Sequence, residues 1–129
     1  MLRAEDLMIG DWVKTVCPKE ESYQRVSDIH FSSYPYIITA GSEEKWFLVE
    51  VEPIPLTQEI LEKNLKEFIL GLNCMYELGG PYCISLEQEN CWVFGLATKV
   101  ARYPMVKIRY VHELQHALRL CGINLEIKI

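Results

Sequence analysis

Apolar and polar residues alternate in short segments through the first fifty residues, and turn residues separate these segments. Alternation with a period of two places successive side chains on opposite faces of a β-strand. Strands are therefore predicted at Trp12–Val16, Tyr23–Ile29, Tyr36–Thr39 and Trp46–Val51. Because strands that recur every 10 or so residues are typical of small barrels and bent sheets, residues 1–52 are predicted to form a β-rich, small-barrel-like lobe.

The segment Glu52-Pro53-Ile54-Pro55 separates this lobe from the rest of the chain. Its two prolines hold the backbone extended and exclude a helix or a central strand. A helix is predicted from 58 to 64, because Thr57 can cap the free amide groups of its first turn. Asn64 can terminate this helix, but apolar residues at helical spacing as far as Leu72 would also allow an extension to residue 70.

Strand patterns return in the second half of the chain. The predicted strands are Tyr82–Leu86, Cys91–Leu96 and Met105–Tyr110. A helix is then predicted at about 111–121, stopped by Gly122 and followed by a short alternating strand, Leu125–Ile129. The predicted class is α+β and mainly antiparallel sheet, with an α+β lobe at 53–129 that packs with the first lobe as one compact unit.

Composition and charge narrow the possible classes of protein. Half of the residues are hydrophobic and 24% are charged, which argues against disorder. The net charge of -5 disfavours a general nucleic-acid-coating role, since phosphate binding needs concentrated positive charge. The five cysteines include no C-x-x-C pair, which is typical of reduced cysteines in a cytoplasmic protein. Neither a signal peptide nor an apolar run of roughly 18 residues is found, so no membrane association is expected.

The predicted second helix contains the sequence His112-Glu113-Leu114-Gln115-His116, which fits the H-E-x-x-H pattern of zinc peptidases. Two histidines four residues apart share a helix face and can hold one Zn²⁺, while the intervening glutamate activates a zinc-bound water. An apolar stripe through Val111, Leu114 and Leu118 is predicted to dock this helix. The projection places His112 and His116 on the opposite side, toward solvent or a cleft.

Other requirements of a zinc hydrolase are not met by the sequence. Catalytic zinc sites need a third protein ligand, which common zinc peptidases place downstream of the motif. The 13 residues after His116 contain no histidine, although His30 could complete a site from the first lobe. A zinc-dependent hydrolase that uses Glu113 with His112 and His116 is therefore kept as an alternative, and no metal or other cofactor is the favoured interpretation.

Three segments resemble a family of small uncharacterised proteins of gut Bacteroidetes, many of them from prophage-like or mobile-element regions. The segments are Ile9–Val13, Ile54–Leu61 and Tyr110–Gln115, which are similar to the family's L-x-x-G-x-x-V, IPLT-x-E-I-L and Y-hydrophobic-H-x-L-Q patterns. The resemblance implies that the positions of Glu113 and His116 vary among relatives, which argues against zinc catalysis as a shared function. The chain departs from the family at residues 64–66, where Asn-Leu-Lys replaces Asn-Gly-Phe.

The most basic stretch lies between residues 99 and 109. It contains four cations and two nearby tyrosines: Lys99, Arg102, Lys107, Arg109, Tyr103 and Tyr110. A sheet face of this composition could bind nucleic acid through phosphate pairing and base stacking, but a solvated strand face is favoured because the chain is acidic. The three tryptophans, at 12, 46 and 92, are interpreted as core anchors rather than ligand platforms.

The leading hypothesis is a small cytoplasmic, non-enzymatic protein of phage or mobile-element origin that acts by binding. Its partner is another protein or a second copy of itself, and the apolar strand Leu125–Ile129 could pair across a homodimer. The alternatives are the zinc-dependent hydrolase and the nucleic-acid-binding module described above.

Overall fold

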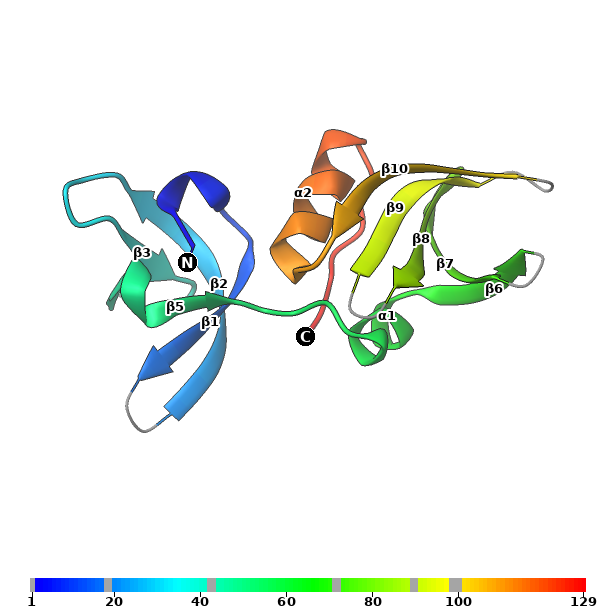
Figure 1. Ribbon diagram of the computed structural model, residues 1–129. Helices are drawn as coiled ribbons and strands as arrows, with labels where there is room; N and C mark the ends of the chain where they lie inside the picture. The colour runs from blue at the N-terminus through cyan, green and yellow to red at the C-terminus, as the bar shows by residue number, and fades with distance from the viewer. Residues whose placement is uncertain (1, 18–19, 42–43, 71–72, 89–90, 98–100) are drawn as a thin grey trace. The chain divides into compact units, whose positions relative to one another are not determined.

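The computed structural model describes residues 2–17, 20–41, 44–70, 73–88, 91–97 and 101–129. The chain divides into two compact units, Met1–Ile54 and Pro55–Ile129. The described residues form two five-stranded antiparallel sheets and two α-helices (Figure 1). The predicted α+β class with mainly antiparallel sheet is therefore confirmed.

The first unit contains one sheet and two short 3-10 turns. Its elements are η1 (Ala4–Asp6), β1 (Trp12–Cys17), β2 (Glu20–His30), β3 (Tyr36–Thr39), β4 (Lys45–Phe47), η2 (Leu48–Glu50) and β5 (Val51–Pro53). The strand order β4-β3-β2-β1-β5 returns the last strand to the side of the first. Pro53 lies in the edge strand β5, where a missing N–H group is tolerated. Since β4 and β5 occupy opposite edges, the described strands do not close into a barrel.

Cross-strand register separates an inner from an outer row of side chains in this unit. The inner row is Ile29, Ile37 and Trp46. It packs with the buried core residues Leu2, Leu7, Val13, Val26, Leu48 and Val51. The outer row, one position along each strand, is His30, Tyr36 and Phe47. Successive residues of a strand point to opposite faces, so the outer row is presented on the face away from the core.

The predicted strand Trp46–Val51 is wrong as a single element. Strand β4 ends at Phe47, and η2 turns the chain before β5 begins at Val51. The Leu48 N–H group donates to the Pro35 carbonyl oxygen (3.3 Å), and the Leu48 side chain is buried. An uninterrupted strand would stay beside β3, whereas the turn lets β5 reach β1.

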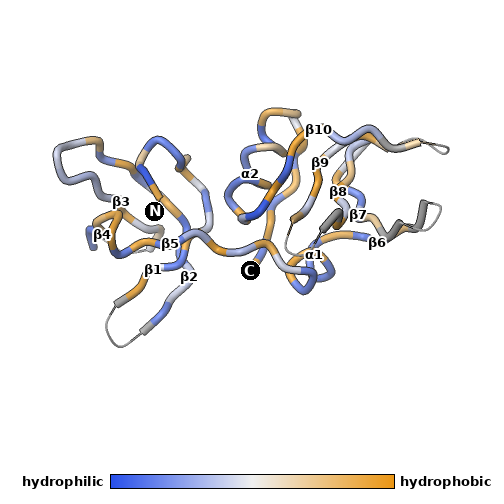
Figure 2. The backbone as a smooth tube through the Cα atoms, viewed as in Figure 1, coloured by the Kyte–Doolittle hydropathy of each residue, from blue (hydrophilic) through white to orange (hydrophobic). Residues whose placement is uncertain are grey.

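The second unit is a meander of five strands with a helix before and after it. Its elements are α1 (Gln58–Asn64), β6 (Lys66–Leu70), β7 (Asn73–Gly79), β8 (Tyr82–Gln88), β9 (Cys91–Ala97), β10 (Arg102–Ile108) and α2 (Val111–Leu120). Each strand pairs with its neighbour in sequence, giving the order β10-β9-β8-β7-β6. Helix α2 lies beside β10 (Figure 1), and the interior strand β9 is apolar along much of its length (Figure 2).

Helix α1 confirms the shorter of the two predicted helices. The Thr57 Oγ1 atom accepts a hydrogen bond from the Ile60 N–H group (3.3 Å), as expected of a cap. The alternative extension to residue 70 is wrong, because Lys66–Leu70 forms strand β6, paired with β7. Asn64 ends the helix by donating its side-chain amide to the Ile60 carbonyl oxygen (2.8 Å).

The predicted strand Leu125–Ile129 is also wrong, because none of its residues pairs in a ladder. The backbone of Lys128 is bound instead by the side chain of Asn64. The Lys128 N–H group donates to Asn64 Oδ1 (2.7 Å), and Asn64 Nδ2 donates to the Lys128 carbonyl oxygen (2.7 Å). Ile127 beside it is only 2% exposed. One amide side chain therefore holds the tail with the same two bonds that a neighbouring strand would supply.

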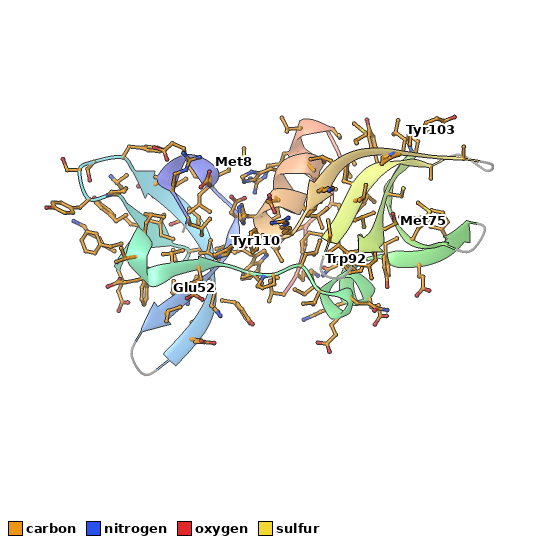
Figure 3. The ribbon with its side chains drawn as sticks, in the orientation of Figure 1. Met8, Glu52, Met75, Trp92, Tyr103 and Tyr110 are labelled. Carbon is orange, nitrogen blue, oxygen red and sulfur yellow. The ribbon has the colours of Figure 1, made fainter. Side chains whose placement is uncertain are left out.

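Strand β10 has an irregular edge that the sequence pattern did not predict. Its pairing with β9 shifts between Pro104 and Val106, and residues 103–107 are all exposed. Tyr103 points away from the sheet (Figure 3). The predicted strand Met105–Tyr110 is confirmed as a strand but not in its limits, because β10 begins at Arg102 and ends at Ile108. Its register with β9 is regular from Val106 to Ile108.

The three tryptophans differ in their surroundings. Trp92 is a buried anchor, as predicted, and its indole N–H group donates to the Leu56 carbonyl oxygen (3.0 Å; Figure 3). Trp46 packs against the core of the first unit while partly exposed. Trp12 is half-buried beneath the guanidinium group of Arg25, 5.5 Å from the ring centre.

The second helix begins and ends close to its predicted limits. It runs from Val111 to Leu120, and Gly122 follows with a φ of 68°, the left-handed conformation that favours glycine. Neither α1 nor α2 is long and apolar enough to cross a membrane, and no other described residues form an α-helix.

Candidate functional site

The two histidines of the H-E-x-x-H sequence lie on α2 with different exposures. His112 is only 5% exposed, whereas His116 is partly exposed. The prediction that both face solvent or a cleft is therefore wrong for His112. Its ring stacks on that of Tyr110, with centres 5.8 Å apart and planes within 11°. The His116 ring meets it edge-on at 5.5 Å. His112 is buried because it packs between two aromatic rings, although the helical projection of the sequence placed it on the polar face.

Glu113 caps the start of α2. Its Oε1 atom accepts hydrogen bonds from the N–H groups of Arg109 (2.9 Å) and Tyr110 (3.0 Å). A carboxylate in the first turn also interacts favourably with the positive end of the helix dipole. This position gives Glu113 a structural role at the helix start.

A third ligand for zinc is missing from the part of the chain that the structure describes. No group of three His, Cys, Asp or Glu side chains there is arranged to hold a metal ion. His30, the candidate third ligand, instead places Nε2 3.0 Å from Asp28 Oδ2. The described residues therefore do not assemble the zinc site of the alternative hypothesis.

Replacing Glu113 tests its capping role. We expect Glu113→Ala to destabilise the protein by about 1 kcal/mol, because two backbone donors lose their acceptor. Glu113→Gln keeps an acceptor oxygen and should recover most of this loss. Urea unfolding followed by circular dichroism measures both changes. An unchanged stability for Glu113→Ala would contradict the capping role.

Only part of the predicted basic surface can be placed. Lys99 lies outside the described residues, and Arg102 lies in β10 without a described side chain. Lys107 and Arg109 are both exposed. Tyr110 is partly exposed and stacks one face of its ring on His112. The described residues thus provide two exposed cations and one exposed ring, that of Tyr103.

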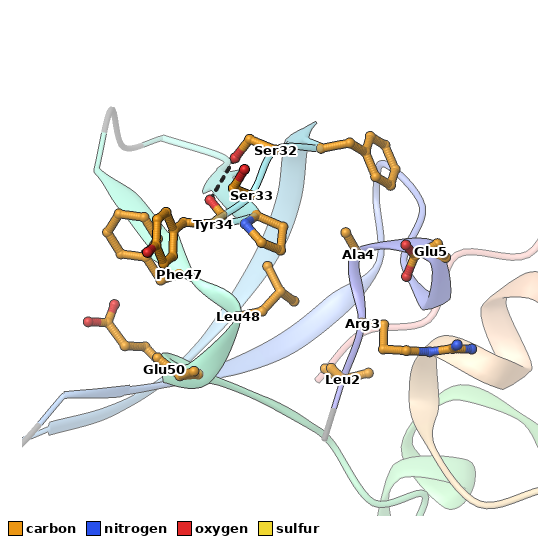
Figure 4. A pocket seen from close by; sticks show the side chains of 13 residues that line it. Leu2, Arg3, Ala4, Glu5, Ser32, Ser33, Tyr34, Phe47, Leu48 and Glu50 are labelled. Carbon is orange, nitrogen blue, oxygen red and sulfur yellow. Dashed lines mark hydrogen bonds between the residues drawn. The ribbon is translucent and has the colours of Figure 1, made fainter.

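The first unit contains an open apolar hollow of about 970 Å³. Three segments far apart in sequence line it: residues 2–5 around η1, residues 31–35 between β2 and β3, and residues 47–50 at the end of β4 and in η2 (Figure 4). We call it the aromatic hollow. Buried side chains of Leu2, Ala4 and Leu48 belong to its lining.

Large apolar side chains on the wall of the aromatic hollow are exposed. They are Phe31, Tyr34, Phe47 and Val49. Tyr34 is 79% exposed and Val49 77%. A single exposed apolar residue is common, but several gathered around one concavity are typical of a binding surface. Their apolar surface is exposed to water, and an apolar partner would bury it.

Neighbouring contacts fix the wall of the aromatic hollow. Phe47 pairs with Tyr36 across β3 and β4, and their rings meet edge-on with centres 6.1 Å apart. His30 stacks on Tyr36 at 4.5 Å, and the Lys45 ammonium lies 4.9 Å from the same ring centre. In the adjoining turn, the Ser32 hydroxyl donates to the Tyr34 carbonyl oxygen (2.8 Å; Figure 4). These contacts hold the wall in place before a partner binds, which lowers the entropy cost of binding.

Among the described residues, the rim of the aromatic hollow carries one cation and two carboxylates. Arg3 donates to Asp6 through Nε (3.4 Å) and Nη2 (3.2 Å). The hydrogen bond and charge of Asp6, and then the charge of Glu5, raise the pKa of the Arg3 guanidinium above its usual value. Glu5 and Glu50 are the carboxylates among the lining residues.

The residues of the aromatic hollow were not among the candidate site residues predicted from the sequence. A usable signal was present in the segment Phe31-Ser-Ser-Tyr-Pro-Tyr36, where large rings occur within a turn. Apolar residues in a turn do not belong to the regular apolar face with which a strand or helix packs on the core. Their presence in a turn therefore indicates a contact other than core packing.

Comparisons with known proteins give no match: no family model, no curated protein and no solved structure is similar enough to the chain to inform its function.

Proposed function

We propose that this protein is a non-enzymatic binding module that captures a segment of a partner protein in the aromatic hollow. The observation that carries the proposal is the exposure of Phe31, Tyr34, Phe47 and Val49 around one concavity. Aromatic residues dominate the energy of many protein interfaces, since each covers a large area with few rotatable bonds. An origin in a phage or mobile element stays a prediction from the sequence resemblance.

The strand order of the first unit supports the same proposal. We infer that this unit is wound like a small barrel, because its fifth strand returns beside its first after a four-strand meander. Small domains such as SH3 bind extended peptides in aromatic-lined grooves. Fold alone does not determine function, so the proposal depends on the residues of the aromatic hollow.

Pairing of the sheet edge β10 with another chain is less well supported. Its exposed side chains Tyr103, Met105 and Val106 would favour association. Pro104, the shifted register and exposed Lys107 oppose it, since proline, bulges and lysine are the features by which proteins protect edge strands. The homodimer predicted through Leu125–Ile129 also loses its basis, because that segment is not a strand.

Replacing Phe47 tests the proposed binding site. Dodecamer peptides selected from a random library on the whole protein should bind the wild type and lose about tenfold or more in affinity with Phe47→Ala, as expected for an aromatic hot spot. Amide resonances of residues 31–34 and 48–50 should shift on titration of the ¹⁵N-labelled protein with the selected peptide.

The matched control is Tyr103→Ala, which removes an exposed ring from the second unit. Its affinity for the selected peptides should equal that of the wild type. If selection yields no peptide whose binding depends on Phe47, the proposed function is wrong.

A further inference from the structure

The charges around the aromatic hollow indicate which partner segments it selects. Among the described residues that line it, the cation is Arg3, which is held by Asp6 at 3.2 Å. Asp6 accepts from the Arg3 backbone as well as from its guanidinium group, so this arginine is already engaged by an acidic side chain. Glu50, on the opposite side of the hollow, makes no ion pair or hydrogen bond with any described residue. The described lining residues therefore offer a partner a negative charge, because their cation is already paired.

We infer that the aromatic hollow binds an extended peptide segment in which proline or another apolar residue lies close to a lysine or arginine. This inference rests on the proposed function and adds the chemistry of the partner. Apolar groups of the segment cover the rings of Phe31, Tyr34 and Phe47, and its cation faces Glu50 or Glu5. Opposite charges at an interface rim mainly raise the association rate and exclude partners of the wrong charge.

Proline suits this surface for two physical reasons. A proline-rich segment is already extended in water, so little conformational entropy is lost when it binds. Its ring is apolar and packs flat on aromatic side chains such as Tyr34 and Phe47, which the outer row of the sheet and the adjoining turn hold in place. Phosphate-bearing partners are disfavoured, because the same carboxylates repel them.

The dodecamer selection tests this inference through the sequences that it enriches. The enriched peptides should contain lysine or arginine within about three residues of a proline or a large apolar residue, the span of one polyproline turn. Glu50→Gln should weaken the best peptide about threefold to tenfold, and Glu5→Gln should also weaken it, whereas Glu59→Gln, an exposed carboxylate of α1, should not. Raising the salt concentration from about 50 mM to about 500 mM should weaken binding to the wild type more than to Glu50→Gln.

The outcomes separate this inference from the proposed function. Neutral or acidic peptides whose binding depends on Phe47 would overturn the cationic preference and leave the proposed function standing. Cationic peptides with equal affinity for the wild type, Glu5→Gln and Glu50→Gln would also overturn the inference. The absence of any enriched peptide that depends on Phe47 would overturn both. Thermal unfolding of each variant confirms that the comparisons are made on folded protein.

Discussion

Gly95→Ala is expected to destabilise the protein by about 3 kcal/mol, the range of severe overpacking. A Cβ atom built on Gly95 would lie 2.3 Å from the carbonyl oxygen of Tyr103 and 3.0 Å from the Cα atom of Pro104. Both atoms belong to the backbone of β10, which pairs with β9 at this point. Because no flexible side chain can move aside, β10 must shift away from β9 and weaken its hydrogen bonds.

Urea unfolding followed by circular dichroism measures this loss, with Gly80→Ala as the matched control. Gly80 has a φ of 55°, and a Cβ atom there would meet nothing within 4 Å. Its replacement should cost only about 1 kcal/mol, from the left-handed backbone conformation. Equal losses in the two variants would show that the close approach of β10 is not the cause.

Ile127→Ala is expected to cost about 3 kcal/mol, although Ile127 lies in a tail without regular secondary structure. Its side chain is 2% exposed, so the substitution removes buried methyl groups and leaves a cavity. The neighbouring Lys128 backbone is fixed by two hydrogen bonds to Asn64, which limits how far the tail can move to fill the space.

Leu120→Ala is the control for this second substitution. Leu120, at the end of α2, is exposed, and its replacement should change the free energy of unfolding by less than about 0.5 kcal/mol. Chemical denaturation of both variants and the wild type gives the comparison. A loss below about 1 kcal/mol for Ile127→Ala would mean that the tail adds little to the folded state.

Local signals in the sequence predicted several elements with their correct limits. Strand β3 begins and ends at Tyr36 and Thr39 as predicted, because β-branched and aromatic residues fill it and Gly41 follows. Helix α1 has the predicted limits because its signals are also local: Thr57 caps its start, and Asn64 binds the Ile60 carbonyl oxygen at its end. Both elements are specified by residues within or beside them.

The wrong predictions concern segments whose conformation depends on distant residues. The alternation of Leu125–Ile129 is that of a strand, but the Asn64 side chain, 64 positions before Lys128, binds the backbone. Phe68 lies at helical spacing after α1, yet it pairs with Met75 in the sheet. Periodicity reports how side chains are distributed and does not show whether a pairing partner is available.

The candidate site was predictable only in part. Sequence alone identified the histidines of α2, but it did not show that Tyr110 stacks on His112 or that Glu113 caps the helix. The aromatic hollow draws on three separate segments. No single segment reveals it, because the concave surface forms only where folding brings the three segments together.

The two sheets differ in the order in which their pairings can form. In the second unit every strand pairs with the next one along the chain, so each hairpin closes a short loop and can form early. The first sheet requires Val51 to reach Thr15, and closing a longer loop costs more entropy before any contact repays it. Completion of the β1–β5 pair therefore belongs to the slower part of folding. In the wall of the aromatic hollow, β4 can pair early with β3, its neighbour in sequence, whereas η2, which lies directly before β5, is among the last parts of its unit to be fixed.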